Sequence, residues 1–485
     1  MPRLKPVATV TPAVADGESG RIAGSFRDPS GYVFLFGGRV FRAIDAECRD
    51  TLQHMQQSGV LPRLMRSGAV VETRFVQDGV LLAELEAAHG PHAAFLEHDR
   101  IAHITYPYEW SLSMVADAGI HTLDLQIAAL EAGCSLKDAT AYNIQFVNGA
   151  PRFIDLPSFE RGMRLDVWYA LGQFQRMFVY PLLLGRYQGW DPRSYFIANL
   201  DGRSASQVAG SFKGLQAFRP ALLLDVTMPA IFERRSANSQ SGVKDTGTKS
   251  STAAAQLPNL KRLRSKLKSL ADGYKPTESW VGYTRECSYD DTAESAKKQQ
   301  VAAFIERIAP ATVLDLGANT GDYSYVAARC GADVVAVDQS HDTIEVLYRR
   351  LRKEPARITP AVVDLRNPSP GIGYRNEERP PFFERISADC VMALALIHHL
   401  IVSGNMKMEA VRELFAGMVK RHLILEFVPP DDEMFRKLTM FRRDDFGYLT
   451  LENCIEVFSS CFHLEARAAV PHSGRTLLLF RRKES

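Results

Sequence analysis

The segment VLDLGANTGDYS, residues 313–324, constrains the fold of this chain more than any other segment. Val313, Leu314 and Leu316 have the apolar character of a strand buried in a parallel sheet. Gly317 and Gly321 let the backbone turn sharply and approach a ligand, and a helix expected from about Asp322 points its free N–H groups at the same place. The segment therefore predicts a strand, a ligand-binding turn and a helix, the repeating unit of a doubly wound α/β sheet.

The residues of the turn also discriminate between ligands. Dinucleotide-binding proteins use a similar turn, but their fingerprint requires a third small residue three places after the second glycine. Counting from Gly317, this chain has Asn319, then Gly321, then the acidic Asp322. A carboxylate at that place repels a pyrophosphate but tolerates a ligand that carries a sulfonium and an amino group. The turn therefore favours S-adenosylmethionine, and with it methyl transfer over hydride transfer.

The segments that follow alternate between strand and helix patterns. The second strand, in GADVVAVDQS, ends at Asp338, where a carboxylate suits a ribose diol. The third, ITPAVVDL, ends at Asp364, which can accept a hydrogen bond from an adenine amino group, and Leu365 can cover the ring. The fourth, ADCVMALAL, runs into IHHL, and the fifth, HLILEFV, is expected to end at Glu426. Two last strands around Pro471 read as an antiparallel hairpin.

In combination, these motifs resemble class I S-adenosylmethionine-dependent methyltransferases from about Trp280 to the end of the chain. The resemblance implies a Rossmann-like sheet of seven strands that ends in the hairpin, with S-adenosylmethionine as cofactor. It places the methionine end of the cofactor near Asp315, Gly317 and residues 393–396. The residues expected to bind the cofactor are Asp315, Gly317, Asn319, Thr320, Gly321, Asp338, Asp364, Leu365, Leu394 and Ala395.

Three residues are candidates for the catalytic base: His398, His399 and Glu426. A sulfonium methyl group is already activated, so the protein mainly has to position the acceptor and remove a proton from it. A histidine at the mouth of the site would suit that task. Neighbouring residues of a helix point about 100° apart, so we expect that only one histidine faces the substrate and that the other is structural. The alternative, that both cap a helix or pack in the core, stays open.

Composition indicates a chain long enough for two or three domains, because 485 residues are 46% hydrophobic and 24% charged. A net charge of +2 implies no general affinity for polyanions. The seven cysteines are scattered without a C-x-x-C pair, so we expect no metal site, no disulfide framework and a cytoplasmic location. No apolar run reaches the length of a signal peptide core or a membrane span, so we expect no membrane insertion.

Residues 236–258 have the composition of a flexible linker, rich in Ser, Thr, Gly and Ala. Residues 259–279 then contain a basic helix, expected to be capped by Asn259 and ended by Gly273, with four leucines on one face. Its other face carries five cations without an acid, which suits either RNA phosphates or a solvated face of a docking helix. These cations are Lys261, Arg262, Arg264, Lys266 and Lys268.

Residues 1–235 contain a second constellation, in an α+β domain. Asp138 and Asn143 stand five positions apart, and Asp155 follows after twelve more, in FVNGAPRFID, which predicts a hairpin around Asn148. This segment resembles the catalytic and metal-binding loops of kinase-like phosphotransferases. Upstream, SGYVFLFGGRVFRAI suggests a hairpin of a small lobe, and WSLSMVADAGIHTLDLQIAALEAG a long helix.

The departures from a kinase put phosphotransfer in doubt. Leu136 replaces the usual histidine, Leu156 and Pro157 replace the Phe-Gly pair, and no strand lysine is identifiable. The alternative reading of Asp138 and Asn143 is loop capping. The whole layout also resembles a bacterial group of two-part methyltransferases that includes a rhizobial nodulation protein.

The leading functional hypothesis is methyl transfer to an oxygen or nitrogen of a small molecule or glycan. In that hypothesis residues 1–235 recognise the acceptor, and an acidic, arginine-rich loop at 431–445 closes over it. The alternatives are methylation of RNA or protein, and a bifunctional protein whose N-terminal domain is an ATP-dependent kinase. The acidic loop opposes a polyanion at the mouth, which ranks the nucleic-acid alternative lower.

Overall fold

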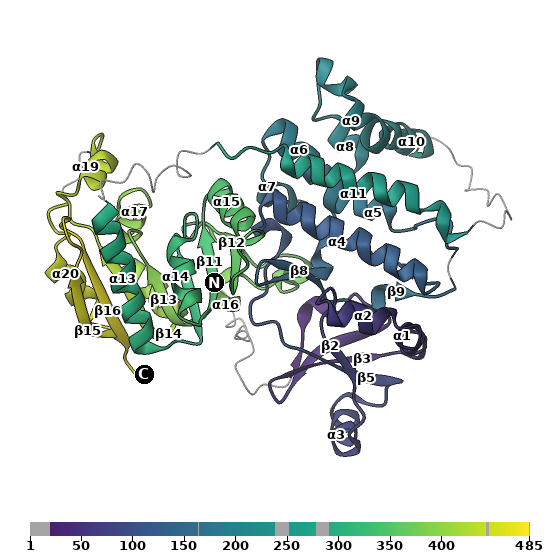
Figure 1. The fold of residues 1–485 in the computed structure, drawn as a ribbon, viewed down its shortest axis with the longest axis horizontal. Coiled ribbons are helices and arrows are strands. Elements are labelled where there is room, and N and C mark those ends of the chain that lie inside the picture. The colour runs from purple at the N-terminus through teal and green to yellow at the C-terminus, as the bar shows by residue number, and fades with distance from the viewer. Residues whose placement is uncertain (1–19, 163, 238–251, 278–290, 443–445, 485) are drawn as a thin grey trace, which may run out of the picture.

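The described part of the chain contains two large β-sheets, which Figure 1 shows, and two sheets of two strands each. The structure is a computed structural model, and it describes residues 20–162, 164–237, 252–277, 291–442 and 446–484. One sheet belongs to the N-terminal half and the other, larger one to the C-terminal half.

The C-terminal sheet has seven strands in the order β12-β11-β10-β13-β14-β16-β15. The first five strands in that order are parallel, and β16 is antiparallel to both β14 and β15. The predicted five strands and closing hairpin are therefore confirmed. The strands are β10 (Thr312–Leu316), β11 (Asp333–Asp338), β12 (Ile358–Val362), β13 (Ala388–Ala393), β14 (Val419–Phe427), β15 (Phe462–Ala469) and β16 (Thr476–Arg482).

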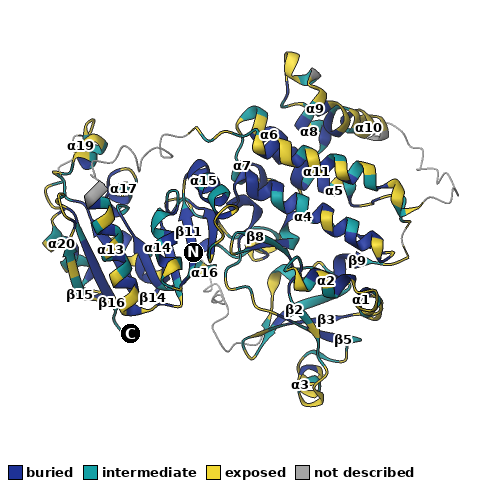
Figure 2. Cartoon of the chain, in the orientation of Figure 1, coloured by how far each residue is buried: buried dark blue, intermediate teal, exposed yellow. Residues whose placement is uncertain are grey.

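Helices cover both faces of this sheet, which is why its parallel strands are mostly buried (Figure 2), whereas the edge strand β15 is partly exposed. Successive residues of β10 alternate between the two cores: Val313 packs with α13, α14 and α15, and Leu314 with α17, α18 and α20. The helices are α13 (Asp291–Ile308), α14 (Asp322–Arg329), α15 (His341–Leu351), α16 (Phe382–Arg385), α17 (Ile397–Val402), α18 (Met408–Met418), α19 (Glu433–Thr439) and α20 (Leu451–Phe458), with a 3₁₀ turn η10 (Tyr374–Asn376).

One strand boundary differs from the prediction. Glu426 lies inside β14 rather than at its end, because the pairing with β16 continues as far as Phe427. Both candidate histidines lie on the short helix α17, directly after the loop that leaves β13.

The N-terminal domain begins with a five-stranded antiparallel sheet in the order β1-β2-β3-β5-β4. The expected hairpin is confirmed, because β2 pairs with β3 around Gly37 and Gly38, both with positive φ. The strands are β1 (Gly20–Arg21), β2 (Gly31–Phe36), β3 (Arg39–Ile44), β4 (Thr73–Phe75) and β5 (Ala94–His98). The helices next to them are η1 (Ala23–Ser25), α1 (Ala46–Gln57), α2 (Val60–Arg66) and α3 (Gly79–His89).

A helical lobe follows, built on the predicted long helix α4 (Leu112–Glu131). The predicted hairpin β7 (Ile144–Val147) to β8 (Ala150–Phe153) is also confirmed, with Asn148 and Gly149 at positive φ in its turn. The other elements are η2 (Pro107–Glu109), β6 (Ser135–Leu136), η3 (Ala141–Asn143), η4 (Leu156–Ser158), β9 (Phe159–Glu160), α5 (Leu171–Phe174), η5 (Gln175–Val179), α6 (Tyr180–Gln188), α7 (Pro192–Phe196), α8 (Ala205–Ala209), η6 (Gly214–Phe218), α9 (Pro220–Leu222), η7 (Leu223–Thr227) and α10 (Met228–Ala237).

The basic helix α11 (Leu257–Asp272) follows η8 (Ala253–Ala255) and packs beside α4 in the helical lobe (Figure 1). Its four leucines are buried, and Gly273 follows its last residue, as expected. Its start differs from the prediction, because Pro258 occupies the first turn and Asn259 lies inside the helix. Most of the predicted linker, residues 238–251, and the segment 278–290 lie outside the described residues.

The sequence suggested that the five cations of α11 have no acidic partners, but four of them bond to carboxylates of this chain. Arg262 and Lys266 both pair with Asp225, at 2.7 Å and 2.5 Å. Arg264 pairs with Asp124 at 2.9 Å, and Lys268 bonds to Asp272 on its own helix. Asp124 and Asp225 are far away in the sequence, so the pattern of α11 alone could not reveal them.

Candidate functional site

A cavity of about 210 Å³ lies where β10, β11 and β12 end, at the carboxyl edge of the C-terminal sheet. Ligands of open α/β sheets bind at this edge. Nine of the ten residues predicted to bind the cofactor line the cavity. They are Asp315, Gly317, Asn319, Thr320, Asp338, Asp364, Leu365, Leu394 and Ala395. Gly321, the tenth, shapes the turn behind them.

Both glycines of the turn have a backbone conformation that favours glycine, with φ of 71° at Gly317 and 85° at Gly321. A Cβ atom on Gly321 would lie 2.4 Å from Cδ1 of Leu347, and one on Gly317 would lie 3.2 Å from Cδ1 of Leu396. Gly321 directly precedes the first residue of α14. The turn is therefore closely packed, and of its two glycines Gly317 lines the cavity.

The two acidic side chains nearest the turn are held by hydrogen bonds. Asp338 accepts the backbone N–H of Asn319 at 2.9 Å and that of Ser340 at 2.8 Å, which fixes its carboxylate at the strand end. Asp315 is 2% exposed and accepts the hydroxyl of Ser324 at 2.6 Å. Burial raises the pKa of Asp315 to about 6, and the Ser324 hydrogen bond offsets only part of this effect.

Asp364 and Leu365 line the opposite side of the cavity, after β12. The carboxylate of Asp364 accepts the side chain of Arg366 at 3.0 Å and its backbone N–H at 3.0 Å. Arg366 also lines the cavity and extends to Gln339 at 2.7 Å. This short network joins the ends of β11 and β12.

The structure separates the three candidate bases. His399 lines the cavity, and burial, followed by the charges of Arg475 and Arg366, lowers its pKa to about 4. His398 is 2% exposed, does not line the cavity, and has no hydrogen-bond partner for either ring nitrogen among the described residues. Burial holds its pKa well below the usual range. Glu426 is fully buried against Lys297 at 2.6 Å. Only His399 therefore has access to a substrate in the cavity.

Several residues that line the cavity were given no role by the sequence, among them Glu294, Lys297, Tyr323 and Arg475. Lys297 lies 4.6 Å from the ring centre of Tyr323. Arg475 is 2% exposed, pairs with Asp432 at 2.7 Å and lies 3.7 Å from Glu426. Lys297, Glu426, Arg475 and Asp432 thus form one buried network of alternating charge beside the cavity. The second turn of α13 and the C-terminal hairpin supply its cations.

The N-terminal constellation is also assembled. Asp155 accepts the side chains of Asn143 at 3.2 Å, Ser158 at 2.6 Å and Arg42 at 2.8 Å. Arg42 comes from β3 and is 7% exposed, so a strand cation is present although it is not a lysine. Burial and the neighbouring Asp155 raise the pKa of Asp138. The Arg42 ion pair occupies the carboxylate that the resemblance to kinases assigned to a metal.

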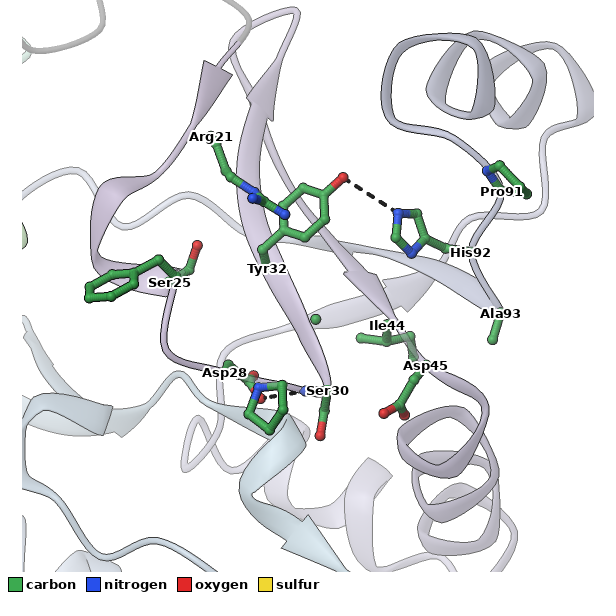
Figure 3. Close-up of a pocket in the computed structure, with 13 residues that line it drawn as sticks. Arg21, Ser25, Asp28, Ser30, Tyr32, Ile44, Asp45, Pro91, His92 and Ala93 are labelled. Carbon is green, nitrogen blue, oxygen red and sulfur yellow. Dashed lines mark hydrogen bonds between the residues drawn. The ribbon is translucent and has the colours of Figure 1, made fainter.

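A second cavity, of about 420 Å³, lies on the N-terminal sheet (Figure 3). The guanidinium of Arg21 covers the ring of Tyr32 at 3.5 Å, and the Tyr32 hydroxyl is 3.4 Å from Nε2 of His92. Asp28 lines this cavity and also pairs with Arg42 at 3.1 Å. The cavity therefore adjoins the Asp155 cluster.

The residues of the first cavity, at the carboxyl edge of the C-terminal sheet, fit an adenosyl sulfonium. Its glycine turn leaves room for a close backbone approach, its acidic groups suit the positive charges of the methionine end, and Asp338 stands where a diol can bind. The strand order, with the antiparallel β16 between β14 and β15, completes the pattern. The C-terminal domain is a class I S-adenosylmethionine-dependent methyltransferase, and S-adenosylmethionine is its cofactor.

Comparison with known proteins identifies the family to which the chain belongs. The chain is 32% identical over 467 residues to nodulation protein NoeA of Rhizobium meliloti (strain 1021), which covers 96% of this chain and 97% of that protein. The chain belongs to the family of this nodulation protein. Residues 285–374 also match the family model described as tellurite resistance protein TehB.

Among solved structures, N-methyltransferase NodS from Bradyrhizobium japonicum WM9 aligns with 40% of this chain and 99% of its own, at 15% identity and a TM-score of 0.30. The bifunctional kinase-methyltransferase WbdD aligns with 40% of this chain and 40% of its own, at 17% identity and a TM-score of 0.29.

Within the described part of the chain, no helix has the length and apolar character needed to cross a membrane. The same residues contain no group of three or more side chains arranged to hold a metal ion.

Proposed function

We propose that this protein transfers the methyl group of S-adenosylmethionine to an oxygen or nitrogen of a small-molecule or glycan acceptor, in the cytoplasm. The charge of the cavity supports this choice of acceptor more than any other observation. Five carboxylates and three cations line it, so the site disfavours a polyanion and tolerates a neutral or cationic acceptor. The carboxylates are those of Glu294, Asp315, Asp322, Asp338 and Asp364, and the cations are Lys297, Arg366 and Arg475.

The proposed division of labour follows the walls of the cavity. Asp315 and the turn around Gly317 hold the methionine end, Asp338 holds the ribose, and Asp364 with Leu365 holds the adenine. When bound, the cofactor supplies a methyl group that is already activated for attack. The chain then has to orient the acceptor, exclude water and accept a proton.

His399 is the proposed proton acceptor, because it is the one candidate base that lines the cavity. Its lowered pKa keeps the imidazole neutral at pH 7, so its ring can accept a hydrogen bond from an acceptor hydroxyl or amine. Leu394, Leu396 and Leu400 also line the cavity, and their apolar side chains limit the access of water. The buried charge network holds Arg475, which also lines the cavity, and we propose that Arg475 positions the acceptor.

The proposed lid, the loop at 431–445, is joined to Arg475 through Asp432. Asp432 caps the N-terminus of α19 by accepting the backbone N–H groups of Met434 and Phe435, and it also holds Arg475. A closing motion of residues 431–442 would therefore act directly on the cavity. Residues 443–445 of the predicted loop lie outside the described part of the chain.

RNA or protein methylation is the first alternative. Four of the five cations on α11 already bond to carboxylates of this chain, which weakens the argument for phosphate contacts. The second alternative is a bifunctional protein with an active N-terminal kinase. The assembly of Asp138, Asn143 and Asp155 favours it, and the ion pair between Arg42 and Asp155 opposes it.

The deciding experiment incubates the protein with methyl-labelled cofactor and a cell extract, and then separates the products by size. The proposal expects label in small molecules or glycans and none with the Asp338→Ala variant, which serves as the control for enzyme-dependent labelling. Label found only in RNA or protein would contradict the proposed acceptor class and would support the first alternative.

A further inference from the structure

Helix α15 lies between the donor cavity and the N-terminal domain (Figure 1). Three contacts join it to the donor site. Ser340, just before the helix, donates its N–H to Asp338 at 2.8 Å. Leu347 packs against Gly321, where an added Cβ would lie 2.4 Å from its Cδ1. Arg350 donates to Asp322 at 2.7 Å. The position of α15 therefore determines the positions of the Asp338 carboxylate, which is proposed to bind the ribose, and of the glycine turn.

The other side of α15 completes the N-terminus of α4. Leu112 and Ser113 are the first two residues of α4, and their N–H groups have no acceptor within the helix. His341 accepts the N–H of Leu112 at 3.0 Å, and Glu345 accepts that of Ser113 at 2.9 Å. The hydroxyl of Ser113 donates to the other oxygen of Glu345, which is fully buried. A carboxylate at this end of a helix is favoured by the helix dipole.

The same face of α15 also completes the C-terminus of α11. Arg349 donates to the carbonyl oxygens of Ala271 and Tyr274, both at 2.9 Å, and it pairs with Glu345 at 2.6 Å. A cation is favoured at a helix C-terminus, just as an anion is at an N-terminus. The Glu345–Arg349 pair of α15 thus caps two helices of the N-terminal domain, α4 at its N-terminus and α11 at its C-terminus.

Tyr348 extends the contact into the core of that domain. It is fully buried within the N-terminal hydrophobic cluster, and its hydroxyl donates to Asp117 of α4 at 2.7 Å. Asp117 also pairs with Arg352 at 3.3 Å. Among the described residues, none of those that line the donor cavity comes from the N-terminal domain.

We propose that the N-terminal domain positions the donor site through α15, and that docking of this domain and binding of S-adenosylmethionine stabilise each other. Ser113 and Asp117 are then positioning residues for donor binding, although neither lines the cavity. The inference rests on the donor-site assignment above, and it concerns the donor rather than the acceptor.

The test measures donor binding in the full-length protein by calorimetry with S-adenosylmethionine and S-adenosylhomocysteine. We expect the double variant Ser113→Ala, Asp117→Ala to bind both at least fivefold more weakly, with kcat at saturating donor changed less than twofold. Gln126→Ala is the matched control, because Gln126 is fully buried on the same helix and its hydrogen bonds go to Ser135, Gln256 and the N–H of Leu136 rather than to α15. Its donor affinity should equal that of the wild type.

A lower melting temperature with unchanged donor affinity in the double variant would overturn the inference, as would equal weakening in the control. Hydrogen exchange of the wild-type protein gives a second measurement that does not depend on the folding of any variant. Added S-adenosylhomocysteine should slow exchange at residues 112–117, and protection confined to residues 313–365 would contradict the coupling. A wild-type protein that binds neither compound would overturn the donor-site assignment itself, and this inference with it.

Discussion

Asp315 combines two properties that are hard to reconcile in an ordinary carboxylate: it lines the donor cavity and it is 2% exposed. Burial disfavours its charged form, while a sulfonium and an amino group favour it. Burial and the charges of Arg475 and Arg366 lower the pKa of His399, which keeps its imidazole neutral at pH 7. The protonation states of these two residues, rather than their identities alone, define what the site binds.

The pKa of Asp315, about 6, predicts a pH-dependent donor affinity. Below this pH the free protein carries a proton that binding of the cationic donor must release. The affinity should therefore fall as the pH decreases below about 6, by up to about tenfold per pH unit, and level off above it. Calorimetry from pH 5 to 8 measures this change. Asp315→Asn should bind weakly and without that dependence, and an identical pH profile in this variant would contradict the role of Asp315.

The two histidines should respond differently to replacement. His399→Ala is expected to slow single-turnover methyl transfer by about 10²-fold or more, since it removes the proton acceptor. His398→Ala should mainly lower the melting temperature, because His398 is buried beside Phe435. Rapid-quench measurements with saturating donor separate the two effects. Unchanged rates in both variants would remove the general-base role from this site.

At the scale of elements, the glycine turn between β10 and α14 makes the sharpest prediction. Gly321→Ala should weaken donor binding at least tenfold, because its Cβ would displace Leu347 and the backbone has φ of 85°. Gly331→Ala is the matched control, since Gly331 has φ of 96° but open space around it. It should lose a similar amount of stability from backbone strain while it keeps its donor affinity. Equal donor affinities in the two variants would contradict the role of the turn.

The strands and the glycine turn could be predicted because their patterns are local. Apolar runs that end in Asp338 or near Asp364 are readable one segment at a time. Lys297 and Arg475 could not be predicted as cavity residues, because only the tertiary fold brings α13 and the C-terminal hairpin together. The start of α11 was misplaced for a related reason: Pro258 fits the first turn as well as Asn259 fits a cap.

At the scale of the whole molecule, the N-terminal domain has the acidic residues and the asparagine of a phosphotransferase site, but Arg42 neutralises the charge of Asp155. Both oxygens of Asp155 accept side chains of Arg42, Asn143 and Ser158. We therefore expect no magnesium-dependent rise in melting temperature with ATP, whereas S-adenosylhomocysteine should raise it. Thermal shift with ATP, in magnesium and in EDTA, provides the measurement. A rise of several degrees that requires magnesium would support the bifunctional alternative.

The central claim is that the turn from Asp315 to Gly321 cradles the adenosyl sulfonium donor. Titration calorimetry with S-adenosylmethionine and with S-adenosylhomocysteine tests it most directly. The account predicts saturable binding of each compound at one site per chain, weakened by Asp338→Ala. An absence of heat with both compounds at millimolar concentration would contradict it.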